Sequence, residues 1–284
     1  IIGLAWGVLL AGIIQLLIQL APLSQIDRLP IPKIGLQNEG VKKVFILMLP
    51  AIIAGGVAQI NLLIDTVFAS LLMTGSPTWL YVSDRLIQFP LGIFAIAIGT
   101  VLLPSLSSAH QRGDLTLYKE HLRKSQRLVI FLAIPSVIGL ALCSEHLIST
   151  LFQRGEFFYT DVTQASKSLI AFSFGLPFFM MMKVFVPAFF SRKDTKTPMY
   201  AALAALALNI ILNYYFAFTL GYGHIGLAFA SSISALLSTG ILYTILVKGN
   251  YIQLTSPLNR FNLAVILGSI SVILFLIYGP FNIN

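Results

Sequence analysis

Four charged residues lie inside long apolar stretches of the sequence: Asp65, Asp84, Arg85 and Lys183. Arginine keeps its proton at any physiological pH, and a charge near the centre of a bilayer costs at least ~2.5–3.5 kcal/mol. Arg85 stands roughly 10 Å into its apolar run at the helical rise of 1.5 Å per residue. Its neighbour Asp84 points about 100° away around a helix, so the two charges do not simply neutralise each other. We therefore expect at least one of them to face a polar interior.

The position of Arg85 fits two interpretations. A guanidinium offers five donors in a planar fork that matches phosphate oxygens, which predicts an anion-binding site in a hydrated cavity. We assign Arg85, Asp84 and Lys183 to this site. The alternative is an interhelical ion pair, with Asp65 as the candidate partner. Lys183 stands near the predicted cytoplasmic end of its span, where its long side chain can also reach the surface.

A second set of polar residues recurs at helical spacing in three apolar segments. Asn61 and Asp65 are four residues apart, as are Asn209 and Asn213, so each pair shares one helix face. The next segment adds three hydroxyls, those of Ser231, Ser232 and Ser234. Carboxylate, carboxamide and hydroxyl oxygens suit a hard cation, and we predict a sodium site at Asp65, Asn209, Asn213 and Ser231. A proton on Asp65, or plain interhelical hydrogen bonds worth about 0.6 kcal/mol a pair, are the alternatives.

The sequence shows no pattern typical of a membrane enzyme. It contains no HExxH motif, no glycine-rich phosphate loop and no Ser-His-Asp set at a common depth. The histidines all fall in or beside predicted loops: His110, His121, His146 and His224. The chain has a single cysteine, Cys143, so an internal disulfide is excluded. Because Cys143 lies in an apolar run, we expect its thiol to be buried and unreactive. We therefore expect a protein that is not an enzyme and needs no cofactor beyond a coupling ion, Na⁺ or H⁺.

Composition indicates the elements that hold these residues. Hydrophobic residues make up 57% of the chain and charged residues 10%, whereas soluble domains carry about 25% charged residues. The predicted fold is an all-α, polytopic membrane helix bundle, because apolar runs of about 20 residues satisfy their backbone in lipid as helices. Eight spans are expected, at 1–22, 44–72, 78–106, 127–150, 164–191, 198–220, 224–247 and 261–279. The net charge of +8 then reflects basic loops rather than nucleic-acid binding.

Basic residues concentrate in alternate loops, which predicts the orientation. The enriched loops and span edges hold Arg28, Lys33, Lys42, Lys43, Arg112, Lys119, Arg123, Lys124, Arg127, Arg192, Lys193, Lys196, Lys248 and Arg260. The intervening loops hold Arg154 and Lys167, so the first set is assigned to the cytoplasm. Residue 1 then lies outside, and we expect the sequence to be part of a longer protein. Residues 106–126 are predicted to form a charged loop with a short surface helix.

Two stretches carry a resemblance to a known family. YVSDRLIQFPLGIFAIAIGTVLLPSLS at 81–107 and SRKDTKTP at 191–198 resemble the lipid II flippases, the MurJ or MviN family of the MOP superfamily. The resemblance implies a MATE-like bundle of two six-helix lobes followed by two extra helices. The chain would then comprise the last helix of the N-terminal lobe (1–22), a cytoplasmic linker (23–43), the C-terminal lobe (44–250) and the first extra helix (251–284).

The resemblance also implies a function. Such a protein flips lipid II, an undecaprenyl-pyrophosphate carrying a disaccharide-pentapeptide, to the outer leaflet of the bacterial inner membrane by alternating access. Arg85 matches the family's cavity arginine in the DR motif. Expected partners are lipid II, membrane lipids and cell-wall synthesis proteins, with no nucleic acid. A cation-coupled multidrug exporter, a flippase for another polyprenyl-linked sugar and a non-transporting scaffold remain alternatives.

Overall fold

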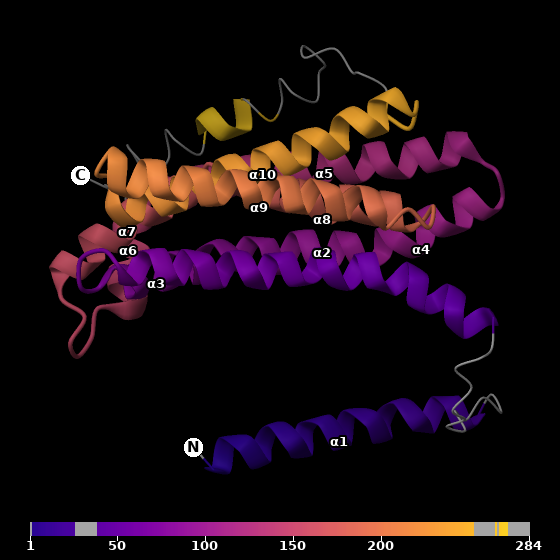
Figure 1. Ribbon diagram of the computed structural model, residues 1–284, viewed down its shortest axis with the longest axis horizontal. Coiled ribbons are helices and arrows are strands. Elements are labelled where there is room, and N and C mark those ends of the chain that lie inside the picture. Colours follow the sequence, from indigo (N-terminus) through magenta and orange to yellow (C-terminus); the bar gives the residue numbers. More distant parts are fainter. Residues whose placement is uncertain (1, 26–38, 253–264, 266, 272–284) are drawn as a thin grey trace. The chain divides into compact units, whose positions relative to one another are not determined.

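The computed structural model describes residues 2–25, 39–252, 265 and 267–271 (Figure 1). The chain forms two compact units, Ile1–Phe45 and Ile46–Asn284. The first unit contains α1 (Ile2–Gln25), whose described side chains are nearly all exposed, as expected of an apolar helix in lipid. The predicted helix at 1–22 is therefore present.

The described residues of the second unit form helices joined by short turns and include no strand, which confirms the all-α class. The first of its helices, α2, begins within the preceding unit. The elements are α2 (Glu39–Ser70), α3 (Ser76–Pro90), η1 (Leu91–Ile96), α4 (Ala97–Gln111), α5 (Leu115–Leu142), α6 (Ser144–Phe152), α7 (Tyr159–Ser173), α8 (Leu176–Phe190), α9 (Lys196–Tyr214), η2 (Tyr215–Thr219) and α10 (Gly223–Lys248). The labels η1 and η2 mark π-helical turns.

Among the residues that the structure describes, five segments are long and apolar enough to cross a membrane, and they correspond to predicted spans. They are Met48–Ser70, Ser76–Gln111, Leu115–Leu142, Lys196–Thr219 and Gly223–Lys248. The helices α7 and α8 are apolar enough together to count as a sixth if they are taken as one span, which is bent by 44° at its break. The predicted span 261–279 lies mostly outside the described residues, so the count of eight spans stays a prediction.

The prediction for residues 106–126 is wrong. Instead of a loop with a short surface helix, α4 continues to Gln111 and α5 starts at Leu115. Gly113 adopts a φ of +69°, and the Asp114 side chain accepts a hydrogen bond from the Leu117 amide at 2.9 Å, which caps α5. Such a glycine and N-cap pair reverses the chain within three residues, so the basic residues that follow extend a helix.

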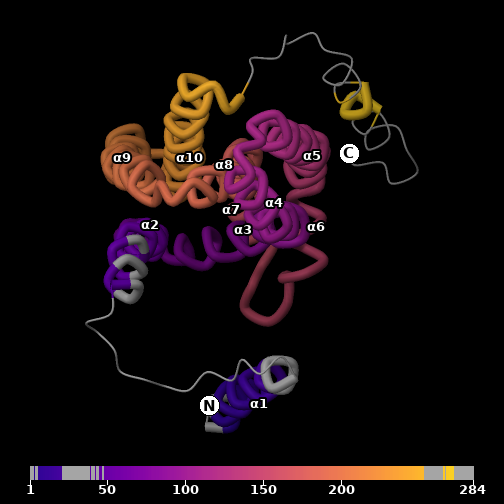
Figure 2. The backbone as a smooth tube through the Cα atoms, turned by 90° about the vertical axis from the view of Figure 1, so that its right-hand side faces the viewer, coloured from indigo at the N-terminus to yellow at the C-terminus, as the bar shows by residue number. Residues whose placement is uncertain are grey.

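Small residues let the helices around α10 approach closely. The Ser232 hydroxyl of α10 donates to the Ala171 carbonyl of α7 at 2.9 Å. A Cβ atom added to Gly226 would lie 2.8 Å from the carbonyl carbon of Phe216. Close backbone approach at small residues is the usual packing mode of membrane helices. Figure 2, which looks along the helices, shows α10 beside α9 and α8.

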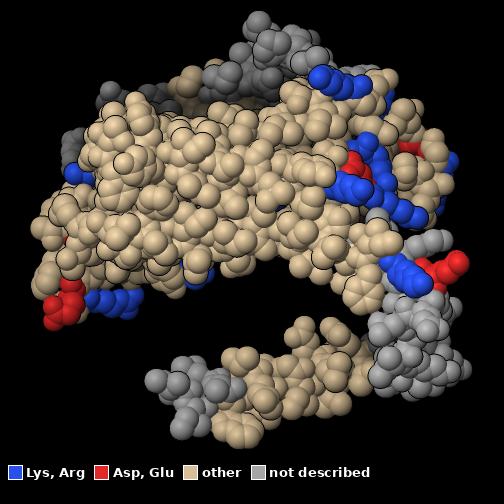
Figure 3. Space-filling view, in the orientation of Figure 1, with Lys and Arg blue, Asp and Glu red and all other residues tan. Residues whose placement is uncertain are grey.

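Charged side chains gather at the ends of this bundle (Figure 3). The α4–α5 turn, the α8–α9 turn and the C-terminal end of α10 lie at one end (Figure 1). They carry Arg112, Lys119, Arg123, Lys124, Arg192, Lys193, Lys196 and Lys248. The other end holds Arg154 and Lys167, so the arrangement agrees with the predicted cytoplasmic side.

Candidate functional site

A polar cluster joins α2 to α9 and α10 at Asp65. The Asn213 amide donates to Asp65 Oδ1 at 2.6 Å, and the Ser231 hydroxyl donates to Oδ2 at 3.1 Å. The Asn61 amide, one turn earlier on α2, donates to Oδ2 at 3.3 Å. Both carboxylate oxygens therefore accept hydrogen bonds, and the donors come from three helices.

Asn209 completes the cluster behind the carboxylate. Its Nδ2 donates to the Ser231 hydroxyl at 3.1 Å, and its Oδ1 accepts from Asn213 Nδ2 at 2.8 Å. Both asparagines are fully buried, and Asn213 Oδ1 has no hydrogen-bond partner among the described residues. A buried acceptor without a donor is unusual and costs about 1–3 kcal/mol. The four residues predicted for a cation site thus lie together, with one unused oxygen.

The donor set of this cluster fits a hard cation. It consists of carboxylate, amide and hydroxyl oxygens, with no nitrogen or sulfur donor required. The orphaned Asn213 Oδ1 is an acceptor that a cation would satisfy. The π-helical turn η2 begins two residues after Asn213, and such turns occur frequently at functional sites.

A cavity of about 220 Å³ opens beside the cluster and contains a second carboxylate. Asp65 and Asp84 both line it, together with Asn61, Ser231 and Tyr81. No lysine or arginine is among the described residues that line this cavity. Its character is acidic, and Asp84, which the sequence grouped with Arg85, faces it from α3.

Arg85 lies on the exposed side of α3. Its guanidinium lies over the ring of Tyr81, 4.7 Å from the centroid. No carboxylate of the described residues stands within ion-pair distance of it, and Asp65 is occupied by Asn213, Ser231 and Asn61. The predicted alternative, an ion pair between Arg85 and Asp65, is therefore not formed.

The structure does not bring Lys183 to the other candidate residues. Its side chain is exposed on α8, and it lines neither of the two described cavities. At Lys183 the backbones of α8 and α4 lie close together. A Cβ atom added to Gly99 of α4 would lie 3.0 Å from the Lys183 carbonyl oxygen. The assignment of Arg85, Asp84 and Lys183 to a substrate stays a prediction.

The SRKDTKTP stretch forms the turn between α8 and α9. The Arg192 guanidinium packs between the rings of Phe189 and Tyr251, at 4.8 and 4.0 Å from their centroids. Asp194 accepts from the amide and the hydroxyl of Thr197, at 3.0 and 2.6 Å, which fixes the start of α9. These contacts give the stretch a structural role in this lobe.

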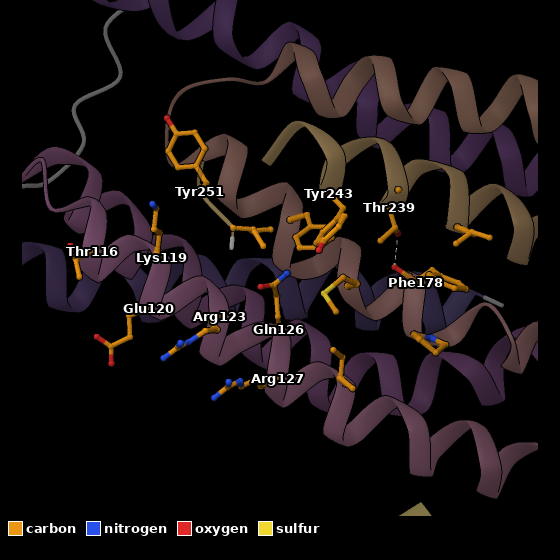
Figure 4. A pocket seen from close by; sticks show the side chains of 17 residues that line it. Thr116, Lys119, Glu120, Arg123, Gln126, Arg127, Phe178, Thr239, Tyr243 and Tyr251 are labelled. Carbon is orange, nitrogen blue, oxygen red and sulfur yellow. Dashed lines mark hydrogen bonds between the residues drawn. The ribbon is translucent and has the colours of Figure 1, made fainter. Parts of the chain in front are cut away.

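Sequence reasoning missed a larger cavity of about 760 Å³ between α5, α8 and α10 (Figure 4). Three basic residues of α5 line one part of it: Lys119, Arg123 and Arg127. The four-residue spacing of these residues was the available signal, but Lys119 and Arg123 fall in the predicted charged loop and Arg127 begins the next predicted span, so a common helix face was not expected.

Comparisons with known proteins agree with this architecture. A family model described as Lipid II flippase MurJ matches residues 1–283. A Vibrio cholerae protein named "Probable lipid II flippase MurJ" is 47% identical over 259 residues, covering 91% of this chain and 48% of its own length. The chain spans about half the length of the curated relatives it matches.

Several solved structures are similar to the chain. "Lipid II flippase MurJ, inward closed conformation" superposes with a TM-score of 0.67 at 32% identity, over 78% of this chain and 45% of that one. An outward-facing multidrug resistance MATE family transporter superposes with a TM-score of 0.65 at 22% identity, over 80% of this chain and 51% of its own. The second likeness concerns the fold alone, which is MATE-like as expected.

Proposed function

The chain belongs to the lipid II flippase MurJ family, and we propose that it forms the C-terminal lobe of a transporter that moves lipid II to the outer leaflet of the bacterial inner membrane. The observation that carries this proposal is the family match over residues 1–283, on a chain whose fold is similar to those of a solved lipid II flippase MurJ and a MATE family transporter. Its relatives are named as flippases rather than enzymes.

Arg85 supplies the chemistry for the head group in this proposal. Stacking on Tyr81 uses the face of the guanidinium and leaves its N–H edge available to an acceptor. A pyrophosphate presents paired oxygens that such an edge binds bidentately. The exposed position lets Arg85 meet a substrate while α3 stays packed on α7.

A bound cation at Asp65 would bias the transport cycle. The hydrogen bonds of Asp65 tie α2, which is otherwise largely exposed, to α9 and α10. A ligand that binds one arrangement of these helices better than another shifts the equilibrium by that difference in affinity. We propose Na⁺ at Asp65, Asn209, Asn213 and Ser231, and protonation of Asp65 is the competing assignment.

The acidic, partly aromatic cavity also favours a second candidate, a cation-coupled drug exporter. Tyr81, Phe172 and Phe179 line it together with the two carboxylates. Its volume of about 220 Å³ argues against this, because pockets for drug-sized ligands occupy about 300–1,000 Å³. The cavity suits an ion with a few waters, so lipid II transport remains the proposal.

The test replaces Arg85 in the native protein, in cells depleted of any other copy. We expect Arg85→Ala and Arg85→Lys to lower the lipid II accessible to an external labelling enzyme by at least tenfold, since lysine cannot bind bidentately. Arg112→Ala at the α4–α5 turn is the matched control and should leave transport unchanged. Normal transport by Arg85→Ala at normal protein level would remove the role assigned to this arginine.

The ion assignment needs a separate measurement. Asp65→Asn should abolish any dependence of transport on the sodium gradient, while Glu156→Gln in the α6–α7 loop should preserve it. If wild-type transport responds to pH but not to sodium, the proton assignment replaces the sodium assignment. If Asp65→Asn changes neither dependence, the cluster serves helix association alone.

A further inference from the structure

The cavity between α5, α8 and α10 changes character along its length (Figure 4). Lys119, Arg123 and Arg127 line one part, and the apolar side chains of Ile130, Met181 and Leu236 line another. We propose that this groove binds an anionic phospholipid of the surrounding bilayer, with its phosphate at the basic residues and an acyl chain along the apolar ones.

The three basic residues form a row along one face of α5. They are spaced four residues apart, and Figure 4 shows them one after another along the helix. Glu120, the acidic residue of this segment, also lines the groove, and its carboxylate pairs at 2.7 Å with Lys124, which lies outside the row. Lys119 donates to Asn250 Oδ1 at 3.2 Å, a neutral acceptor that leaves its charge uncompensated.

The row lies at the depth of lipid head groups. The helix α5 has 28 residues and is therefore about 42 Å long, whereas the hydrocarbon core of a bilayer is about 30 Å thick. Its apolar run begins at Leu128, directly after Arg127. The basic residues therefore stand at the membrane surface, at the end that carries most of the positive charge, and Ile130 is the first groove residue in the hydrocarbon.

Charge complementarity favours a lipid over residues 253–284 as the occupant. This segment contains one arginine, Arg260, and no aspartate or glutamate. It offers no anion to a row of three cations, whereas a phospholipid brings a phosphate together with acyl chains. The volume of about 760 Å³ falls within the ~300–1,000 Å³ typical of small-molecule sites.

The experiment uses the purified native protein, reconstituted in bilayers of phosphatidylcholine with one quarter phosphatidylglycerol and no lipid II. Native mass spectrometry counts the phosphatidylglycerol that each protein molecule retains. We expect Arg123→Gln/Arg127→Gln to retain about tenfold less, as for loss of roughly 1.4 kcal/mol of charged hydrogen bonding. The control Arg112→Gln/Lys248→Gln removes equal charge at the same end, outside the groove, and should retain the wild-type amount.

Two further measurements distinguish lipid binding from misfolding of the variants and from occupation of the groove by another segment. Phosphatidylglycerol should raise the unfolding temperature of the wild-type protein more than phosphatidylcholine or inorganic phosphate does. A photoreactive residue at position 130 should capture lipid. Equal loss in both double variants, equal stabilisation by all three additives, or capture of this chain's own C-terminal residues would each overturn the proposal.

Discussion

Replacing Asn213 by leucine, which has nearly the same shape, is expected to destabilise the lobe. The change removes the hydrogen bonds to Asp65 Oδ1 at 2.6 Å and to Asn209 Oδ1 at 2.8 Å. It leaves both acceptors without another described donor, and Asn209 is fully buried. Asp65 Oδ2 keeps its bonds from Ser231 and Asn61.

The magnitude follows from two limits. Hydrogen bonds between membrane helices average about 0.6 kcal/mol, which gives about 1.2 kcal/mol for two. A buried acceptor left unpaired costs about 1–3 kcal/mol of stability. The substitution also removes Asn213 Oδ1, which is already unpaired, so part of this loss is offset. We therefore expect the free energy of unfolding to fall by about 1–4 kcal/mol for Asn213→Leu.

The assay is equilibrium unfolding of the purified protein in mild detergent, followed by helical circular dichroism. Asn61→Leu is the internal comparison, because the same substitution on the same cluster removes a single, longer bond of 3.3 Å at a half-buried site. It should cost less than Asn213→Leu. Equal losses, or a change below about 0.5 kcal/mol for Asn213→Leu, would refute the account of the cluster, since surface substitutions fall in that range.

Further predictions concern the packing and the turns. Gly226→Ala should cost about 1–3 kcal/mol, because its Cβ would lie 2.8 Å from Phe216 backbone, whereas Gly240→Ala, with open space, should stabilise α10 by about 0.5–1 kcal/mol in the same unfolding assay. Asp114→Ala should cost about 0.5–2 kcal/mol through loss of the α5 cap and increase proteolysis at the α4–α5 turn. Tyr251→Ala should increase hydrogen exchange at the α8–α9 turn, because Arg192 loses a ring contact.

The sequence predicted which segments are helices, because an apolar run in lipid has few other ways to satisfy its backbone. The sequence did not predict the part of α5 that extends beyond the apolar run. Hydropathy reports contact with lipid rather than helicity, so residues 106–126 were predicted as a charged loop with a short surface helix, although α5 begins at Leu115. The break at Cys143 between α5 and α6 was equally invisible within an apolar run.

The polar cluster was predictable for a related reason. Buried asparagines and an aspartate are costly in lipid, so pairs such as Asn209 and Asn213 on one helix face point inward to partners. The sequence could not say which atom donates to which, because that depends on how each helix is rotated. A helix that is apolar around most of its circumference does not encode its rotation, so the exposed position of Arg85 was not predictable.

The rotation of α3 explains how one short motif holds two opposite charges. Asp84 lines the acidic cavity beside Asp65, whereas Arg85, the next residue, lies on the exposed side over Tyr81. A helix turns about 100° per residue, so consecutive positions serve different faces of the same rigid element. A displacement of α3 on occupation of the acidic cavity must therefore move Arg85 as well. In the proposed transporter this continuity links ion binding to the head-group contact without any intervening flexible segment.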